Sequence, residues 1–159
     1  MLPRFLTPLL LLVLAVIATP GCSDLQSAEA LPPITVYRHP SCGCCSLWMR
    51  HLKANGFEVQ AEKVLDMEHG FDRFNIPRQL EACHTAVVDG YLIEGHVPAA
   101  DVMRLLEERP DVRGLAVPGM PIGSPGMEGP NPEAYQVLSF DKHGVVREFS
   151  YHEPRGTRP

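Results

Sequence analysis

The feature that most constrains this chain is a cluster of three cysteines, Cys42, Cys44 and Cys45, within four residues. The cluster follows a β-rich run at 34–37 and precedes a segment whose apolar residues recur at helical spacing. Those apolar residues are Leu47, Trp48 and Leu52. The sequence therefore predicts a strand, a cysteine loop and a helix in that order, with the thiols at the start of the helix.

The segments that follow continue this alternation of strands and helices. Alternating apolar residues at 57–64 predict a second strand that returns parallel to the first. Apolar residues at 67, 71 and 74 predict a helix that breaks at Ile76-Pro77, with one further turn at 78–83. Asp89-Gly90 between apolar runs predicts a β-hairpin over 85–97.

The last predicted helix begins at Pro98 and ends near Glu108. Residues 109–132 contain six prolines and five glycines, which predicts a long loop without regular structure. A hairpin is predicted over 135–140 and 145–151. The order β-α-β-α-β-β-α, followed by this added C-terminal hairpin, predicts an α/β fold with a thioredoxin-like core.

Length and charge limit the function classes. The chain has 159 residues, so after a leader of about 30 residues it is long enough for one domain. The formal net charge is −5, and no basic run or basic–aromatic patch is present. Nucleic-acid binding is therefore excluded, because it would have no electrostatic basis.

The N-terminal residues are typical of an exported protein. Arg4 precedes an apolar stretch at 9–18, which is shorter than the ~20 residues of a membrane-spanning helix. Two cleavage patterns fit: a lipoprotein-like site before Cys22, and Ala28-Glu29-Ala30. The first would leave a lipid anchor at Cys22 as the link to a membrane. Both predict a periplasmic protein with a signal peptide and linker at 1–30, a domain at 31–153 and a frayed tail at 154–159.

Four cysteines remain if Cys22 is removed or lipidated. Cys42 and Cys45 have the C-x-x-C spacing of redox dithiols, and a helix N-terminus favours their thiolates. A dithiol oxidoreductase has no evident use for a third thiol, whereas clustered thiolates select soft ions such as Cu(I), Zn(II) or iron–sulfur centres. Cys44, with Cys83 as a fourth sulfur, therefore favours a metal site.

Four motifs in the same order carry a family resemblance that covers about residues 34–151. They are Tyr37-Arg38-His39-Pro40-Ser41-Cys42-Gly43-Cys44-Cys45, Cys83-His84-Thr85-Ala86, Glu94-Gly95-His96-Val97-Pro98 and the Pro/Gly-rich run at 118–128. This pattern resembles the CopG family of periplasmic copper-resistance proteins, which was long catalogued only as a domain of unknown function.

The resemblance implies a thioredoxin-like fold, a C-x-C-C copper site and a role in copper homeostasis. It places the metal ligands on Cys42, Cys44, Cys45 and Cys83. We expect these thiolates to hold Cu(I), with sulfur bridges allowing more than one ion. Redox cycling of the copper would make the protein a copper-dependent oxidoreductase. By family analogy, its partners would be a periplasmic copper chaperone or exporter.

Four other residues are candidates for supporting this site. His84 adjoins Cys83, and His96 follows a glycine that permits close backbone approach. Met120 and Met127 lie in the Pro/Gly-rich loop, and their thioethers suit Cu(I). The remaining histidines without motif context are predicted to be surface residues: His51, His69, His143 and His152.

Two other functions stay open on sequence grounds. The first is a thiol-disulfide oxidoreductase that uses Cys42 and Cys45. Against it, related oxidoreductases carry a proline just before the strand predicted at 85–88, where this chain has Cys83-His84. The second is a structural module held by two disulfides, which predicts no free thiols and no metal affinity.

Overall fold

The computed structural model describes residues 30–66 and 73–154 of the chain. The predicted signal peptide, Cys22 and nearly all of the linker therefore lie outside the described residues, as does the tail from 155 onward. The helix predicted from 67 to 74 falls mainly on 67–72, which also lie outside them.

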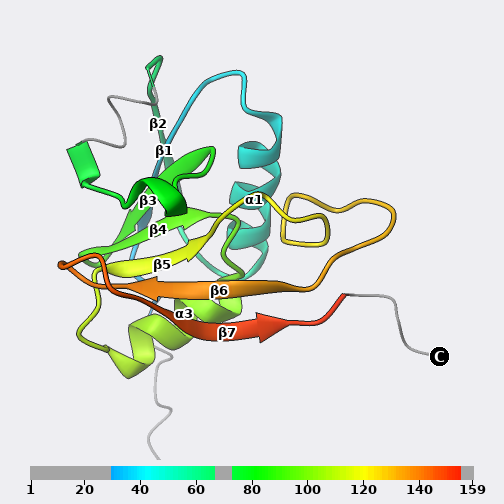
Figure 1. Cartoon of the computed structure of the whole chain (residues 1–159). Coiled ribbons are helices and arrows are strands. Elements are labelled where there is room, and N and C mark those ends of the chain that lie inside the picture. Colours follow the sequence, from blue (N-terminus) through cyan, green and yellow to red (C-terminus); the bar gives the residue numbers. More distant parts are fainter. Residues whose placement is uncertain (1–29, 67–72, 155–159) are drawn as a thin grey trace, which may run out of the picture.

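One mixed sheet organises the described residues (Figure 1). In chain order the elements are β1 (Ile34–Arg38), α1 (Gly43–Ala54), β2 (Val59–Lys63), the 3-10 turn η1 (Arg78–Leu80), β3 (His84–Val88), β4 (Tyr91–Gly95), α3 (Ala99–Glu108), β5 (Gly114–Val117), β6 (Tyr135–Phe140) and β7 (Val146–His152). The strands of this described part form a seven-stranded sheet in the order β2-β1-β3-β4-β5-β6-β7. The predicted α/β class is confirmed.

Most of the predicted local structure is present. β1 and β2 pair in parallel through the crossover helix α1. β3 and β4 form the antiparallel hairpin predicted from Asp89-Gly90, and both turn residues have the positive φ that such a turn requires. β6 and β7 form the predicted C-terminal hairpin, which pairs with β5 at one end of the sheet.

The prediction that residues 109–132 contain no regular structure was wrong in part. β5 (Gly114–Val117) lies inside this segment and pairs in parallel with β4. All four of its residues are buried, because the sheet is covered on both faces at this position. A strand of this kind shows no apolar–polar alternation, and the surrounding prolines and glycines conceal it.

Each face of the sheet has its own apolar cluster. Both helices pack on the same face, where Trp48 and Leu52 of α1 and Val102 of α3 meet the strands. The other face carries a smaller cluster that includes Leu80 and Phe140. Neighbouring strand residues therefore belong to opposite clusters, as strand geometry requires.

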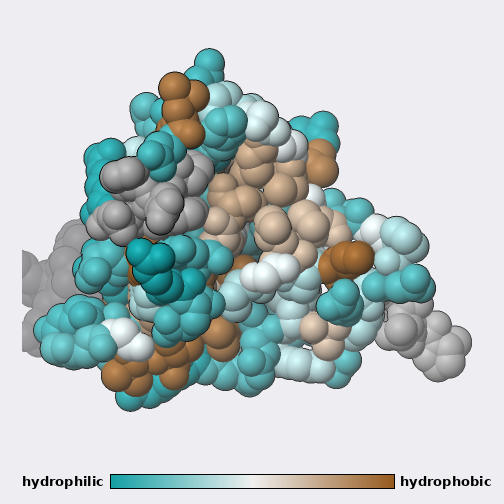
Figure 2. Space-filling view, turned by 45° about the horizontal axis from the view of Figure 1, so that its top comes forward, coloured by the Kyte–Doolittle hydropathy of each residue, from teal (hydrophilic) through white to brown (hydrophobic). Residues whose placement is uncertain are grey.

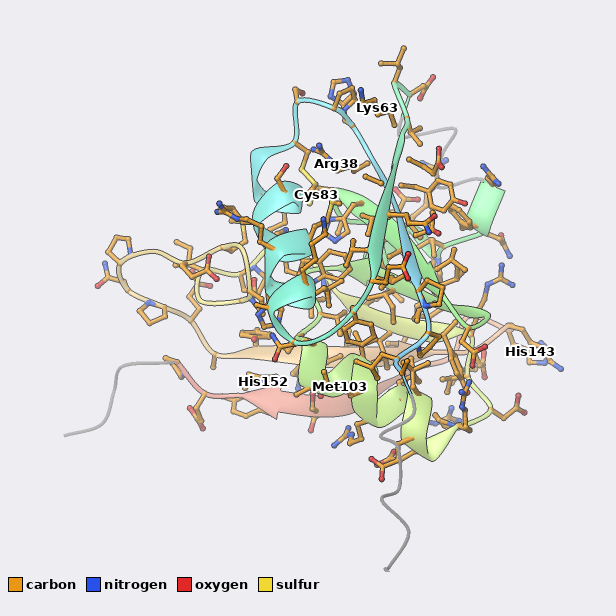
Figure 3. All side chains as sticks on the ribbon, turned by 180° about the vertical axis from the view of Figure 1, so that it is seen from behind. Arg38, Lys63, Cys83, Met103, His143 and His152 are labelled. Carbon is orange, nitrogen blue, oxygen red and sulfur yellow. A yellow bond between two sulfur atoms is a disulfide. The ribbon has the colours of Figure 1, made fainter. Side chains whose placement is uncertain are left out.

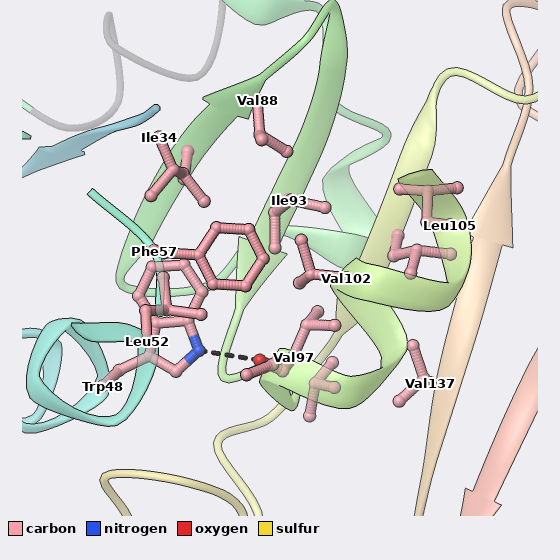
Figure 4. Packing of buried hydrophobic residues seen from close by; sticks show 14 of the residues in the cluster. Ile34, Trp48, Leu52, Phe57, Val88, Ile93, Val97, Val102, Leu105 and Val137 are labelled. Carbon is pink, nitrogen blue, oxygen red and sulfur yellow. Dashed lines mark hydrogen bonds between the residues drawn. The ribbon is translucent and has the colours of Figure 1, made fainter. Parts of the chain in front are cut away.

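Trp48 connects α1 to the segment that follows β4. Its side chain is fully buried, and its Nε1–H donates a hydrogen bond to the carbonyl oxygen of Val97 at 2.8 Å (Figure 4). A buried indole needs such a partner for its only polar group. This contact fixes the distance between the start of α1 and the end of β4.

Helix length matters for the relation to a membrane. In the part of the chain that the structure covers, neither helix is long and apolar enough to span a bilayer.

Candidate metal centre

Sheet register brings the predicted cysteines together. Arg38, the last residue of β1, pairs with His84, the first residue of β3. The chain leaving β1 therefore passes beside the chain entering β3, which places Cys42 near Cys83. Figure 3 shows Cys83 beside the first turn of α1 and close to Arg38. The four sulfur atoms of Cys42, Cys44, Cys45 and Cys83 all lie within 4.8 Å of one another.

A disulfide joins two members of this four-sulfur group. Cys42 is bonded to Cys45, while Cys44 and Cys83 are free thiols. The sulfur of Cys44 lies 3.5 Å from that of Cys42 and 3.8 Å from that of Cys83. The sulfur of Cys83 lies 3.5 Å from that of Cys45. Each free thiol therefore contacts one sulfur of the disulfide.

The start of α1 is built around this disulfide. Cys42 is the N-cap residue, and its sulfur accepts a hydrogen bond from the backbone N–H of Cys45 at 3.3 Å. The first turn contains no acidic residue that would oppose a thiolate there. On reduction, the Cys42 sulfur would therefore be favoured as a thiolate by the helix N-terminus.

Two buried histidines also contact the sulfur atom of Cys83. Nδ1 of His84 and Nε2 of His96 are each 3.3 Å from the Cys83 sulfur. Neither ring is exposed to solvent, and the His84 ring packs against Trp48 with centroids 4.4 Å apart. Both histidines predicted to support the site therefore contact its sulfur group directly.

Burial controls the protonation of these groups in the metal-free protein. It raises the pKa of the Cys83 thiol to about 12, and the neighbouring Cys44 adds to this shift. Burial also lowers the pKa of His84 to about 3, with a further contribution from His96. The imidazoles are therefore neutral and able to bind a metal, whereas Cys83 must release a proton to do so.

Arg38 supports the cysteine loop, a role that sequence reasoning missed. Its Nη1 donates to the carbonyl oxygen of Cys42 at 2.8 Å and makes longer contacts with those of His39 and Pro40. The guanidinium thus contacts three carbonyl oxygens of one loop and places a positive charge near the thiols. No sequence pattern marks this role, because every partner is a main-chain oxygen.

Glu94 supports the segment that carries Cys83. It is fully buried, accepts the backbone N–H of Ala82 at 2.7 Å and accepts the Thr85 hydroxyl at 2.6 Å. Burial raises the pKa of Glu94 to about 8, although both hydrogen bonds oppose the shift. The carboxyl group therefore ties the backbone of Ala82 and the side chain of Thr85, on either side of Cys83, to β4.

The Pro/Gly-rich loop covers the start of α1. The Pro125 carbonyl accepts a hydrogen bond from Nδ1 of His96 at 2.7 Å. At Gly126, a Cβ atom would lie 2.7 Å from the backbone nitrogen of Trp48, so the loop touches the helix. Met127 follows directly, whereas Met120 is 38 % exposed. Covering of a metal by either methionine stays a prediction.

The sulfur group is reachable from outside. Cys42, Cys44 and Cys83 are half-buried, and Cys45 is fully buried. Figure 2 brings forward the end of the molecule at which α1 begins, and it shows a moderately hydrophobic area bordered by hydrophilic residues. A metal ion or a small reductant could therefore reach the thiols from this end.

Two histidines predicted to be surface residues have structural partners instead. Nε2 of His51 accepts the backbone N–H of Ala99 at the start of α3. Nε2 of His152 lies 2.8 Å from the Asp101 carboxylate, which also accepts the Ser150 hydroxyl. That prediction was wrong for these two residues because their partners come from distant segments. His143 is exposed, and His69 lies outside the described residues.

The residues present fit a soft or borderline metal ion. Three cysteine sulfurs at the start of α1 and two imidazoles from β3 and the end of β4 surround the sulfur of Cys83. The buried ring of His84 places Nδ1 3.3 Å from the Cys83 sulfur, and a neutral imidazole nitrogen is a common metal ligand. The fold and the site define a mixed α/β protein with a cysteine–histidine cluster of metal-binding type.

Comparison with known proteins identifies the family. A family model described as "Protein of unknown function, DUF411" matches residues 80–127. A solved structure titled "Copper resistance protein copG- Form 2" is 45% identical, with a TM-score of 0.73, and the match covers 77% of this chain and 98% of that chain. The "Form 1" structure is 44% identical, with a TM-score of 0.72 and the same coverage. No curated protein matches. The chain belongs to the CopG family of copper resistance proteins.

Proposed function

We propose that this protein binds Cu(I) through Cys42, Cys44, Cys45 and Cys83 and acts in copper resistance. The observation that carries this proposal is the convergence of the four sulfur atoms within 4.8 Å of one another. Thiolates are soft ligands that favour Cu(I), and one thiolate can bridge two ions. Sulfurs this close together therefore suit more than one Cu(I) ion.

The local electrostatics support this function. Four thiolates in one place repel each other and need compensation. The N-terminus of α1 and the Arg38 guanidinium lie beside them, and bound copper ions would supply the remaining positive charge. Loading would require two electrons and two protons from an external reductant, because the Cys42–Cys45 disulfide must first open to two thiols.

The finer architecture and the location belong to the same proposal. We infer that β1 to α3 form a thioredoxin-like core and that β5 to β7 extend it. The apolar stretch at 9–18 supports export to the periplasm, with lipidation at Cys22 as an alternative fate of the leader. A periplasmic copper chaperone or exporter would then be the partner that delivers or removes the ion.

Redox cycling is a further part of this proposal. Bound Cu(I) would give one electron to an external acceptor, and the resulting Cu(II) would take one electron back from an external donor. A site with both thiolate and imidazole donors can hold both oxidation states. Such turnover would make the protein a copper oxidoreductase.

One observation favours a second candidate function. The Cys42–Cys45 disulfide lies at a helix N-terminus, which is the arrangement of dithiol oxidoreductases. Such an enzyme would pass two electrons from its dithiol to a substrate disulfide. Cys44 would then have no necessary role, since Cys42 and Cys45 would complete the reaction.

The decisive experiment is an anaerobic titration of the reduced protein with Cu(I) against a competing chelator. We expect tight uptake by the wild type and a loss of capacity in Cys44→Ser, with Ser46→Ala as a control at the exposed neighbouring position. Disulfide reductase activity is assayed in parallel. Copper affinity no greater than that of an ordinary dithiol, unchanged by Cys44→Ser, would refute the proposal and favour the second function.

A further inference from the structure

Cys83 belongs to two groups of metal-binding side chains. One is the four-sulfur group, and the other consists of Cys83, His84 and His96, whose ligand atoms also lie within 4.8 Å of one another. The Cys42–Cys45 disulfide removes two thiolates from the first group. It leaves every member of the second group free to bind a metal.

His96 is held in the tautomer that a metal ligand needs. Its Nδ1 lies 2.7 Å from the carbonyl oxygen of Pro125. Because a carbonyl oxygen only accepts, Nδ1 must carry the proton, and Nε2 then directs its lone pair at the Cys83 sulfur 3.3 Å away. A backbone partner for the distal ring nitrogen is the usual support for a metal-bound histidine.

His84 completes the group from β3. Its Nδ1 is 3.3 Å from the Cys83 sulfur, and its ring centroid is 5.2 Å from that of His96. The ring is fully buried, and Nδ1 is the ring nitrogen that faces the sulfur. A neutral imidazole with one ring nitrogen beside a thiol sulfur is placed to bind the same metal ion as that sulfur.

We propose that the disulfide form of this protein binds a single divalent ion through Cys83 Sγ, His96 Nε2 and His84 Nδ1. One thiolate and two imidazoles suit Cu(II) and borderline ions such as Zn(II) and Co(II), whereas several thiolates suit Cu(I). Binding forms the metal–sulfur bond and releases the proton of the Cys83 thiol. Cu(II) as the cellular ion rests on the function proposed above, but the donor set does not.

Opening or closing the Cys42–Cys45 disulfide then determines which of the two metal sites is available. With the disulfide open, four thiolates are available for Cu(I). With it closed, Cys44 keeps its thiol, but Cys83, His84 and His96 are the group that retains all of its ligand atoms. The oxidation state of Cys42 and Cys45 would thus decide whether the protein holds a monovalent or a divalent ion.

The test uses the full chain carrying Cys22→Ser, with the Cys42–Cys45 disulfide confirmed by thiol counting. Anaerobic titration with Co(II) avoids thiol oxidation and gives a thiolate-to-metal charge-transfer band. We expect one Co(II) per chain. Cys83→Ser should abolish the band, and His96→Gln should weaken binding at least tenfold. Ser46→Ala is the matched control and should bind Co(II) like the wild type, because Ser46 is exposed and belongs to neither group of metal-binding side chains.

A second measurement uses the protein with all proposed ligands intact, so that poor folding of a variant cannot be mistaken for loss of metal binding. Zn(II) added to the disulfide form should shift the ¹⁵N resonances of His96 Nε2 and His84 Nδ1 and leave His143 unchanged. Absence of these shifts, or a loss of Co(II) binding in Ser46→Ala as large as that in Cys83→Ser, would overturn the inference. Co(II) binding by the disulfide form without Cu(I) binding by the reduced form would refute only the proposed function.

Discussion

The ring of His96 donates a hydrogen bond from Nδ1 to the main-chain oxygen of Pro125, 2.7 Å away. This contact joins the end of β4 to the loop that covers α1, and it fixes the proton of a fully buried imidazole. The same hydrogen bond therefore positions both the His96 side chain, which faces Cys83, and the loop that contains Pro125.

The first prediction concerns this proton. Burial lowers the pKa of His96 below its ordinary value, so the ring should stay neutral, with the proton on Nδ1, at pH 6.5 and above. Long-range ¹H–¹⁵N correlation spectra of the metal-free protein distinguish the two ring nitrogens. A proton on Nε2 would contradict the assignment, and the exposed His143 gives a reference signal in the same spectrum.

The second prediction concerns the contact between the loop and α1. Gly126 has a φ of +86°, and an added Cβ would lie 2.7 Å from Trp48 N and 3.0 Å from the Cys44 carbonyl oxygen. Gly126→Ala should therefore cost about 1–2 kcal/mol for the backbone conformation and about 1–3 kcal/mol for crowding. Gly144→Ala is the matched control, since φ is +78° and no atom lies within 4 Å of the added Cβ.

Denaturant unfolding of both glycine variants separates the two costs. Displacement of the loop in Gly126→Ala should also speed alkylation of Cys44. Equal stability of the two variants would show that the loop does not press on the helix.

The third prediction is a pH dependence of folding stability in the metal-free protein. The pKa of Glu94 is raised by burial from 4.5 to about 8, so the native state keeps a proton that the unfolded chain has released. The contribution of this proton to stability is complete below about pH 4.5 and is lost as the pH rises to about 8. The limiting slope is about 1.4 kcal/mol per pH unit.

Glu94→Gln should remove the loss of folding stability that the wild type shows as the pH rises from about 4.5 to about 8. Urea unfolding at pH 5, 6.5 and 8 should show the variant gaining stability relative to wild type as the pH rises. Glu107→Gln, at an exposed position of α3, should follow wild type throughout. The lowered pKa of His84 acts in the opposite direction below pH 6.5, so the comparison between variants is needed to isolate Glu94.

The fourth prediction concerns the attachment of β7 to α3. The buried Asp101 carboxylate accepts the Ser150 hydroxyl at 2.7 Å and lies 2.8 Å from Nε2 of His152. Asp101→Ala should cost about 1–3 kcal/mol, because it leaves the Ser150 hydroxyl and Nε2 of His152 without their shared partner. A double-mutant cycle with His152→Gln should give a coupling energy of at least about 0.5 kcal/mol. Additive effects would show that the pair is not coupled, and thiol reactivity should stay unchanged.

Local signals in the sequence predicted most of the fold. Asp89-Gly90 predicted the hairpin, and the spacing of Trp48 and Leu52 predicted the buried face of α1. β5 was missed because a four-residue strand buried on both faces has neither alternation nor length. Its existence depends on β4 and β6, which flank it only in the folded sheet.

For the candidate site, the sequence predicted the cysteines but not the residues that support them. The cysteine spacing indicated which sulfurs to consider, and their convergence agrees with that prediction. The roles of Arg38 and Glu94 could not be predicted, because their partners include main-chain groups brought close by sheet register. The sequence also left open which cysteines pair, since three thiols in one helical turn allow several disulfides.

The side chains that we propose as metal ligands lie where regular elements begin or end. Cys42 caps α1, Cys83 immediately precedes β3, and His96 immediately follows β4. Such positions move with the sheet and do not fray on their own as loop tips do. Heating should therefore release bound metal and unfold the domain in one cooperative transition, and the ion would act as a cross-link that slows unfolding.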